Sequence, residues 1–197
     1  MSDTRTKARI LEGPDAGMAA GGPSFSLGNR IQRAIWILVW GICASWTPRQ
    51  LAPWRRLLLR SFGATMDAGS DVRGSARVWY PPNLVMRERA LIGPRVNCYN
   101  MGLITLERGA SVSQDASLCG GTHHFDDAGF QLVARDIVIG AQAWIAAEAF
   151  VGPGATIGEG AVLGARGVAF GRLDPWTVYA GNPARPVRER KRFAPPF

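Results

Sequence analysis

The residues from Ile137 to Ala169 repeat every six positions, and this period constrains the fold more than any other feature of the chain. Each unit has an aliphatic residue, usually a small residue two positions before it, and in most units a glycine directly after it. The aliphatic positions are Ile139, Ile145, Val151, Ile157 and Leu163. A period of six fits neither a helix face nor an array of hairpins. It suits a solenoid with three short strands and three tight corners per turn.

Each position of the repeat has an expected role in such a solenoid. The aliphatic side chain should point inward, and the small residue should fit the crowded interior. We expect the glycine to permit corner geometry with φ > 0. The glycines of the repeat are Gly140, Gly152, Gly158 and Gly164. The core is therefore predicted to be a stack of coils.

The same register continues upstream with small insertions. Val72, Ile92 and Val112 follow one another at intervals of 20 residues, which corresponds to three hexapeptides plus two extra residues per coil. Val78, Cys98 and Leu118 show the same spacing. We expect the extra residues near 81–82 and 101–102, as small bulges at corners.

A long loop is expected where the repeat lapses. The pattern is absent for 21 residues between Leu118 and Ile139. The simplest interpretation is one hexapeptide step and a loop of about 15 residues, longer than most connections in compact domains. A long loop that leaves a rigid scaffold usually carries function.

The composition limits the classes of protein that fit. A length of 197 residues suits one main domain with an appendage. The three cysteines, Cys43, Cys98 and Cys119, show neither metal-ligand spacing nor a disulfide framework, which favours buried thiols and a reducing cytoplasm. The net charge of +8 comes from scattered basic residues without an aromatic platform, so no nucleic-acid partner is predicted. A phosphate-bearing cofactor or an anionic membrane surface would use this charge equally well.

Changes in composition divide the chain into four regions. Residues 1–24 form a polar tail that we expect to be disordered. A helical cap is expected over 25–66. The repeat domain covers 67–180 and includes the loop at 119–137, and a C-terminal tail follows at 181–197.

Residues 27–46 form an apolar helix candidate, opened by Ser26 or Asn29 and closed before Pro48, with a second helix at about 52–61. Its uninterrupted apolar part is about 13 residues long, short of the roughly 20 that a bilayer span requires. Two interpretations of this helix stay open. It either covers the open end of the first coil, where strand edges would otherwise be exposed, or attaches peripherally to a membrane. The residues that favour membrane attachment are Trp36, Trp40 and Trp46 with the flanking Arg30, Arg33 and Arg49.

The chemistry is best sought at His123 and His124, which are the only histidines of the chain and lie at the start of the long loop. A neutral imidazole is suited to taking a proton from a hydroxyl group near neutral pH. Neighbouring residues of an extended segment point in opposite directions, so only one of the two should face a given substrate. A purely structural histidine remains an alternative. A metal site would need a third ligand, and none has a recognisable spacing, so no metal is expected.

Several motifs resemble those of the hexapeptide-repeat acyltransferases, and among these the acetyltransferases of colanic acid biosynthesis. The resemblance covers roughly residues 25–188 and depends on VSQDASLCGGTHHF, AWIAAEAFVGPGATIGEGAVLGARGV and PWTVYAGNPARPV. It implies a left-handed parallel β-helix with an N-terminal helical cap and a long extruded loop. It also implies a homotrimer that transfers an acetyl group from acetyl-CoA to a sugar hydroxyl, in exopolysaccharide or related glycan biosynthesis.

The resemblance assigns roles to particular residues. His123 matches the general base that activates the acceptor hydroxyl for attack on the thioester. His124 stands where relatives commonly have an acidic residue, so the group that orients His123 stays open. The candidates are Asp115, Asp126, Asp127, Glu148 and a backbone carbonyl. Acceptor contacts are implied for Asn97, Tyr99, Asn100 and His124. Cofactor contacts are implied for Trp144, Ala146, Ala147, Gly164, Ala165, Arg166, Arg185 and Arg188, and the backbone N–H groups of Ala146 and Ala147 would also face the developing oxyanion.

Three other functions stay open at this point. The same scaffold serves N-acetyltransferases of amino sugars. A non-catalytic β-helix that acts as a scaffolding subunit would show no thioester turnover. A metal-dependent β-helix hydratase would need three histidines, and the chain has two.

Overall fold

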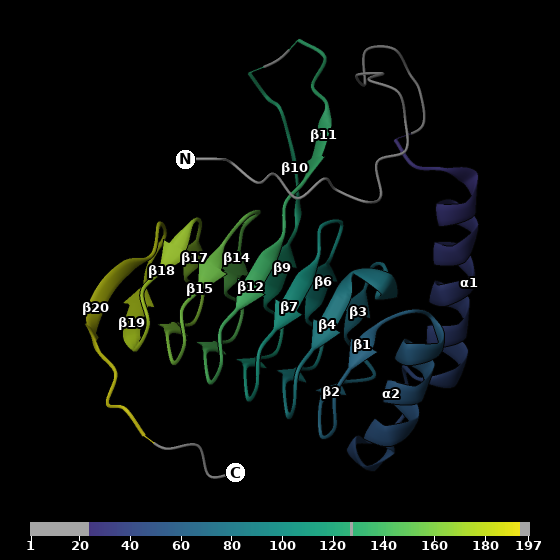
Figure 1. Ribbon diagram of the computed structural model, residues 1–197, viewed down its shortest axis with the longest axis horizontal. Helices are drawn as coiled ribbons and strands as arrows, with labels where there is room; N and C mark the ends of the chain where they lie inside the picture. Colours follow the sequence, from purple (N-terminus) through teal and green to yellow (C-terminus); the bar gives the residue numbers. More distant parts are fainter. Residues whose placement is uncertain (1–23, 127, 194–197) are drawn as a thin grey trace.

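The computed structural model describes residues 24–126 and 128–193, so most of the predicted N-terminal tail and residues 194–197 lie outside the described residues. It shows a stack of coils with two helices across one end (Figure 1). Helix α1 covers Leu27–Cys43 and α2 covers Ala52–Ser61, joined by the short 3-10 helix η2 (Arg49–Leu51). Ser26 caps α1, because its hydroxyl accepts a hydrogen bond from the backbone N–H of Asn29 at 3.2 Å.

Each turn of the chain adds one strand to each of three parallel sheets. Sheet A contains β1 (Thr65–Met66), β4 (Leu84–Met86), β7 (Ile104–Leu106), β12 (Ile137–Ile139), β15 (Thr156–Ile157) and β18 (Arg172–Leu173). Sheet B contains β2 (Asp71–Val72), β5 (Leu91–Ile92), β8 (Ser111–Val112), β13 (Trp144–Ile145), β16 (Val162–Leu163), β19 (Thr177–Ala180) and the antiparallel β20 (Arg185–Glu189). Sheet C contains β3 (Arg77–Val78), β6 (Asn97–Tyr99), β9 (Ser117–Cys119), β14 (Phe150–Val151) and β17 (Val168–Ala169).

The predicted register is confirmed. Val72 pairs with Ile92, and Ile92 pairs with Val112, in adjacent coils of sheet B. Val78, Cys98 and Leu118 align in the same way in sheet C. These side chains fill the interior of the stack, and burial raises the pKa of the Cys98 thiol to about 12. One extra-residue corner is the 3-10 helix η3 (Pro81–Asn83), close to the expected position.

The expected role of the repeat glycines is wrong. Positive φ does not fall on Gly140 or Gly158 but two residues later, at Gln142 and Gly160. Gly140, Gly158 and Gly164 instead lie where the backbone of the next coil approaches closely, whereas Gly152 lies against the ring of Phe170. A Cβ atom built on Gly158 would lie 2.6 Å from the nitrogen of Pro175 in the next coil. Glycine is therefore needed for the spacing between coils rather than for its backbone angles.

Replacing Gly158 with alanine is expected to lower the free energy of unfolding by about 1–3 kcal/mol, the usual cost of overpacking a tight site. The atoms that a Cβ would meet are backbone atoms, so no side chain can rotate away. Gly41→Ala is the matched control, because a Cβ there has no atom within 4 Å. Alanine at this helix position should stabilise by about 0.5–1 kcal/mol. Urea unfolding of both variants tests the pair, and equal shifts would contradict the close-approach explanation.

The helices cover the open end of the first coil, so the capping interpretation is confirmed. Trp36 is 1% exposed, and its indole N–H donates to the carbonyl of Val78 at 2.7 Å. The indole N–H of Trp40 donates to the carbonyls of Gly74 and Ala76 at 3.0 and 3.1 Å. Two of the three tryptophans that favoured membrane contact thus face the protein instead.

A buried ion pair attaches α2 to the same coil. The side chain of Arg55 is fully buried and its Nη2 lies 2.9 Å from Oδ1 of Asp71. Arg55 also donates to the carbonyls of Val72 and Pro48 at 2.7 and 2.8 Å. The charge is thereby satisfied on several sides, as a buried guanidinium requires.

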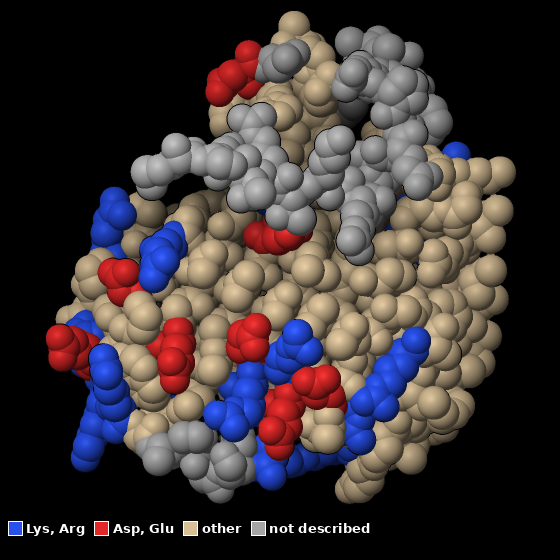
Figure 2. Space-filling view, in the orientation of Figure 1, with Lys and Arg blue, Asp and Glu red and all other residues tan. Residues whose placement is uncertain are grey.

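No helix among the described residues is long and apolar enough to cross a membrane. Figure 2 shows charged side chains of both signs over the side of the coils that is turned to the viewer. The edge of the molecule formed by α1 carries few charged atoms in this view.

Candidate active site

A β-hairpin leaves the stack in the region where the sequence predicted a long loop. Strand β10 (Gly121–His123) pairs with the antiparallel β11 (Leu132–Ala134), and the hairpin projects from the corner between sheet C and sheet A (Figure 1). Its base is closed by a hydrogen bond from the N–H of Arg135 to the carbonyl of Gly120, at 2.8 Å. The hairpin therefore has a defined direction relative to the coils.

The ring of His123 is held by a backbone carbonyl. Its Nδ1 lies 2.9 Å from the carbonyl oxygen of Phe130, and the two rings stack with centroids 4.2 Å apart and planes inclined by 13°. A carbonyl can only accept, so Nδ1 carries the proton in this contact, and in the neutral ring Nε2 then has the free lone pair. Of the candidates that the sequence left open, the backbone carbonyl is the group that contacts the imidazole.

Phe130 has an unusual backbone for such a large residue. Its φ is +44°, in the left-handed region that bulky side chains rarely adopt. Such local strain is often retained at functional sites. Here the strained residue is the one whose carbonyl and ring both contact His123.

Of the four carboxylates considered as orienting groups, two bond to arginines and one lies outside the described residues. Asp115 forms two hydrogen bonds to Arg95, at 2.8 and 2.6 Å, and the guanidinium lowers the pKa of that carboxyl. Glu148 accepts from Arg166 at 2.8 Å. Asp127 lies outside the described residues. Asp126 lies in the hairpin and lines the same pocket as His123.

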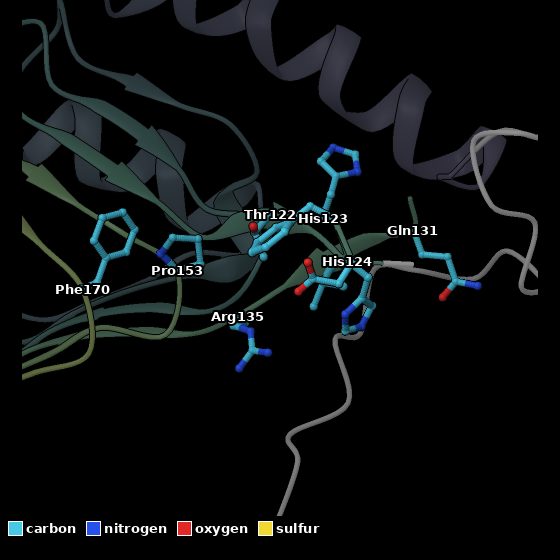
Figure 3. Close-up of a pocket in the computed structure, with 10 residues that line it drawn as sticks. Thr122, His123, His124, Gln131, Arg135, Pro153 and Phe170 are labelled. Atoms are coloured by element: carbon cyan, nitrogen blue, oxygen red, sulfur yellow. The ribbon is translucent and has the colours of Figure 1, made fainter. Parts of the chain in front are cut away.

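The two histidines point to opposite sides of the hairpin strand, as their adjacency predicts (Figure 3). The backbone N–H of His124 donates to the carbonyl of Gln131 at 2.9 Å, which continues the hairpin ladder by one step. The side chain of His124 is exposed. The two imidazoles therefore cannot act on the same atom from this one chain.

An open pocket of about 780 Å³ lies between the hairpin and the coils behind it. This volume is within the range of about 300–1,000 Å³ that is typical of small-molecule sites. Its walls come from both parts of the fold (Figure 3). Among the lining residues are Thr122, His123, His124, Arg135, Pro153 and Phe170.

The three predicted acceptor residues of β6 and its following corner have different environments. Asn97 is exposed, whereas Tyr99 is half-buried with its ring edge-to-face against Trp79, at 5.3 Å. Asn100 is fully buried, and its side-chain amide bonds to both the N–H and the carbonyl of Tyr80, at 3.0 and 2.7 Å. Asn100 therefore joins two coils and presents no side-chain atom to a ligand.

The predicted cofactor residues lie on a different part of the chain from His123. Trp144 begins β13 in sheet B and is 45% exposed, with its indole N–H bonded to the hydroxyl of Ser113 at 2.9 Å. The segments 146–147 and 164–166 form the corners that follow β13 and β16, and Arg185 and Arg188 lie on β20. None of these residues lines the hairpin pocket. Within one chain, the two predicted halves of the site are not brought together.

Sequence reasoning missed several residues of this site, among them Phe130, Arg135, Pro153 and Phe170. Pro153 and Phe170 follow strands of successive coils, and they meet the hairpin only through folding. No pattern in the sequence marks them. The positive φ of Phe130 has no sequence signal either, because the residue is neither glycine nor asparagine.

No group of three or more His, Cys, Asp or Glu side chains that could hold a metal ion occurs in residues 24–126 and 128–193.

Comparison with known proteins shows close relatives in sequence. A protein of Escherichia coli (strain K12) with the name "Putative colanic acid biosynthesis acetyltransferase WcaF" is 40% identical over 166 residues. The match covers 84% of this chain and 91% of that protein. No family model matches the chain.

Solved structures share the fold at much lower identity. A maltose O-acetyltransferase from Clostridium difficile 630 aligns with a TM-score of 0.72 at 19% identity, covering 85% of this chain and 90% of that one. A hexapeptide-repeat acetyltransferase from Vibrio cholerae O1 biovar eltor, complexed with acetyl coenzyme A, also gives 0.72 at 19% identity, covering 84% and 88%. The fold is the parallel β-helix that the repeat predicted, and it fits the left-handed form that the resemblance implied.

Proposed function

The chain belongs to the family of hexapeptide-repeat acetyltransferases represented by WcaF, and on that basis we propose that it transfers an acetyl group from acetyl-CoA to a sugar hydroxyl. The single observation that supports this proposal most strongly is the contact between His123 Nδ1 and the Phe130 carbonyl. In the neutral ring it leaves Nε2 able to accept a proton, on the face of the hairpin opposite to the one that carries Thr122 and His124 (Figure 3).

The proposed reaction needs two proton transfers, one from the acceptor hydroxyl to His123 and one from His123 to the leaving sulfur. Nε2 of His123 takes the proton of the acceptor hydroxyl while its oxygen attacks the thioester carbonyl. The tetrahedral intermediate then collapses, the C–S bond breaks, and the CoA sulfur receives the proton from the imidazolium. The carbonyl of Phe130 keeps accepting from Nδ1 throughout, so the ring does not need to rotate between the two transfers.

Acetyl-CoA is proposed as the donor, and the neighbour that was solved with acetyl coenzyme A supports this choice. The phosphates of CoA need cationic partners. Arg185 and Arg188 are exposed on β20 and pair with no carboxylate in the described part of the chain, so they are available for this role. Arg166 is already paired with Glu148 and is a weaker candidate.

A homotrimer is proposed because one chain does not bring the two halves of the site together. His123 lies on the hairpin at the corner between sheets C and A, whereas the cofactor candidates lie along sheet B and its following corner. A neighbouring copy that packs its sheet against this hairpin would complete the site. Sedimentation equilibrium should give three times the chain mass, and a mass of one chain would contradict the proposal.

The acceptor is proposed to be a sugar or glycan of exopolysaccharide biosynthesis. The relatives named for colanic acid biosynthesis and the neighbour named as a maltose O-acetyltransferase support a sugar. An amino sugar, which would be acetylated on nitrogen, is the second candidate. We propose that the enzyme works at the cytoplasmic side of the membrane, where such glycans are assembled.

The nature of the product tests the proposal. Wild-type protein is incubated with acetyl-CoA and a panel of neutral sugars, glycosides and amino sugars, and the products are analysed by mass spectrometry before and after mild alkali. We expect an acetylated neutral sugar whose acetyl group is removed by alkali, because an ester is labile and an amide is not. An alkali-stable acetyl group found only on amino sugars would replace O-transfer by N-transfer.

A further inference from the structure

Helix α1 has a second apolar face, which points away from the protein. Five residues on it recur at intervals of three or four positions, as one side of a helix requires. They are Leu27, Ile31, Ile35, Leu38 and Ile42, and their exposed fractions are 68%, 51%, 49%, 62% and 64%. The opposite side of the same helix buries Trp36 and Trp40 against the first coil. We refer to these five exposed residues as the outer face of α1.

Aromatic side chains continue the outer face at the C-terminal end of the helix. Trp46 is 69% exposed, and its indole N–H donates to the carbonyl of Ile42. Trp54 of α2 is 40% exposed and donates to the carbonyl of Cys43 at 2.8 Å. Tryptophans with one apolar side and one bonded N–H are typical of the boundary between lipid and water.

The helical segment that carries the outer face has charges of one sign only. The residues from 24 to 66 include six arginines and no aspartate or glutamate, and three of the arginines, Arg55, Arg56 and Arg60, bond to the first coil. Arg30 and Arg49 are exposed near the two ends of α1. Arg33 packs over the rings of Phe25 and Trp79, and no carboxylate in the described part of the chain pairs with it. The exposed charges at the two ends of the apolar face, Arg30 and Arg49, are therefore both basic.

This combination favours an anionic lipid surface over another protein copy. A second copy docked face to face would bring arginines against arginines without a carboxylate to neutralise them, which is unfavourable. Anionic headgroups would neutralise the arginines while the apolar side chains enter the boundary of the acyl chains. The helix lies across the end of the stack, so its outer face can rest on a flat surface (Figure 1).

We infer that the outer face of α1 holds this protein on an anionic membrane surface, with the helix lying in the interface rather than across it. The functional role of this contact rests on the proposed function. A surface-bound acetyltransferase would meet acceptors that are attached to lipid. The apolar residues supply the attachment, and the arginines restrict it to anionic lipid.

Vesicle sedimentation tests the inference. Wild-type protein is mixed with vesicles of phosphatidylglycerol and phosphatidylcholine, and in parallel with vesicles of phosphatidylcholine alone. We expect sedimentation with the mixed vesicles and much less with the neutral ones. The double variant Leu38→Glu/Ile42→Glu should lower the partition coefficient at least about tenfold, since it places carboxylates in the buried part of the contact. Both side chains point outward, so the variant should keep the wild-type circular dichroism spectrum and melting temperature.

Val187→Glu is the matched control, because Val187 is 64% exposed on β20 at the other end of the stack. It should bind the mixed vesicles as the wild type does. The inference is overturned if wild-type protein stays in the supernatant with anionic vesicles, or if the double variant binds equally well. It is also overturned if sedimentation equilibrium without lipid shows an assembly that the double variant dissociates, since another copy would then occupy the face.

Activity separates this inference from the proposed function. Release of CoA with a water-soluble acceptor, in the absence of vesicles, should be the same for the double variant and the wild type. If neither protein turns over and the wild type still binds anionic vesicles, the proposed function is contradicted and the membrane contact stands.

Discussion

Replacing His123 with alanine is expected to lower kcat for acetyl transfer by about a hundredfold or more, the usual effect of losing a general base. The acceptor hydroxyl would have to attack without giving up its proton to a positioned group. Binding of acetyl-CoA should be unchanged, because the residues proposed to contact it lie on sheet B and its corners. Steady-state kinetics and calorimetric titration with CoA measure the two effects separately.

His124→Ala is the matched control for this prediction. His124 is the same residue type at the next position, but its side chain points to the other side of the strand. We expect a change in KM for the acceptor at most, with kcat within a few fold of the wild type. A large fall in kcat for His124→Ala and a normal kcat for His123→Ala would show that the roles of the two residues are exchanged.

Replacing Trp36 with alanine is expected to lower the free energy of unfolding by about 3–5 kcal/mol, which is typical of removing a large buried aromatic side chain. Trp36 fills the end of the first coil, with Trp40 and Phe62 at ring distances of 5.0 and 5.1 Å. Its loss would leave a cavity and remove the hydrogen bond to the Val78 carbonyl. Urea unfolding at a fixed chain concentration measures the change.

Trp46→Ala serves as the control for Trp36→Ala. Trp46 is the same residue type in the turn that follows α1 but is 69% exposed. Its replacement should change the free energy of unfolding by no more than about 0.5 kcal/mol. If the two substitutions destabilise equally, α1 does not act as a packed cover for the first coil.

Most of the fold could be predicted because the repeat is a local property of the sequence. The spacing of Val72, Ile92 and Val112 already fixes which strands pair, since each coil must place one aliphatic residue inward at the same position. The position of the hairpin follows from the lapse of the repeat after Leu118. Handedness is not determined by spacing and was implied by the resemblance to known acyltransferases.

The details that could not be predicted depend on contacts between coils. The glycines of the repeat are required because the next coil approaches closely, with its backbone at Gly140, Gly158 and Gly164 and with the Phe170 ring at Gly152, and the residues of a single coil do not reveal this. The carbonyl that holds His123 belongs to Phe130, seven positions away across the hairpin, and every residue has such a carbonyl. The residues that form the outer face of α1 could not be predicted from the sequence, for a related reason. The helix is apolar on both sides, so its pattern does not indicate which tryptophans turn inward.

Acceptor-dependent release of free CoA from acetyl-CoA by wild-type protein is the most direct test of the central claim. The account predicts that at least one sugar or glycoside stimulates this release and that the His123→Ala variant loses the stimulation while it still binds acetyl-CoA. A wild-type protein that binds acetyl-CoA without acceptor-dependent release, or a His123→Ala variant that turns over normally, would contradict the account. Failure to bind acetyl-CoA would favour a non-catalytic scaffolding role.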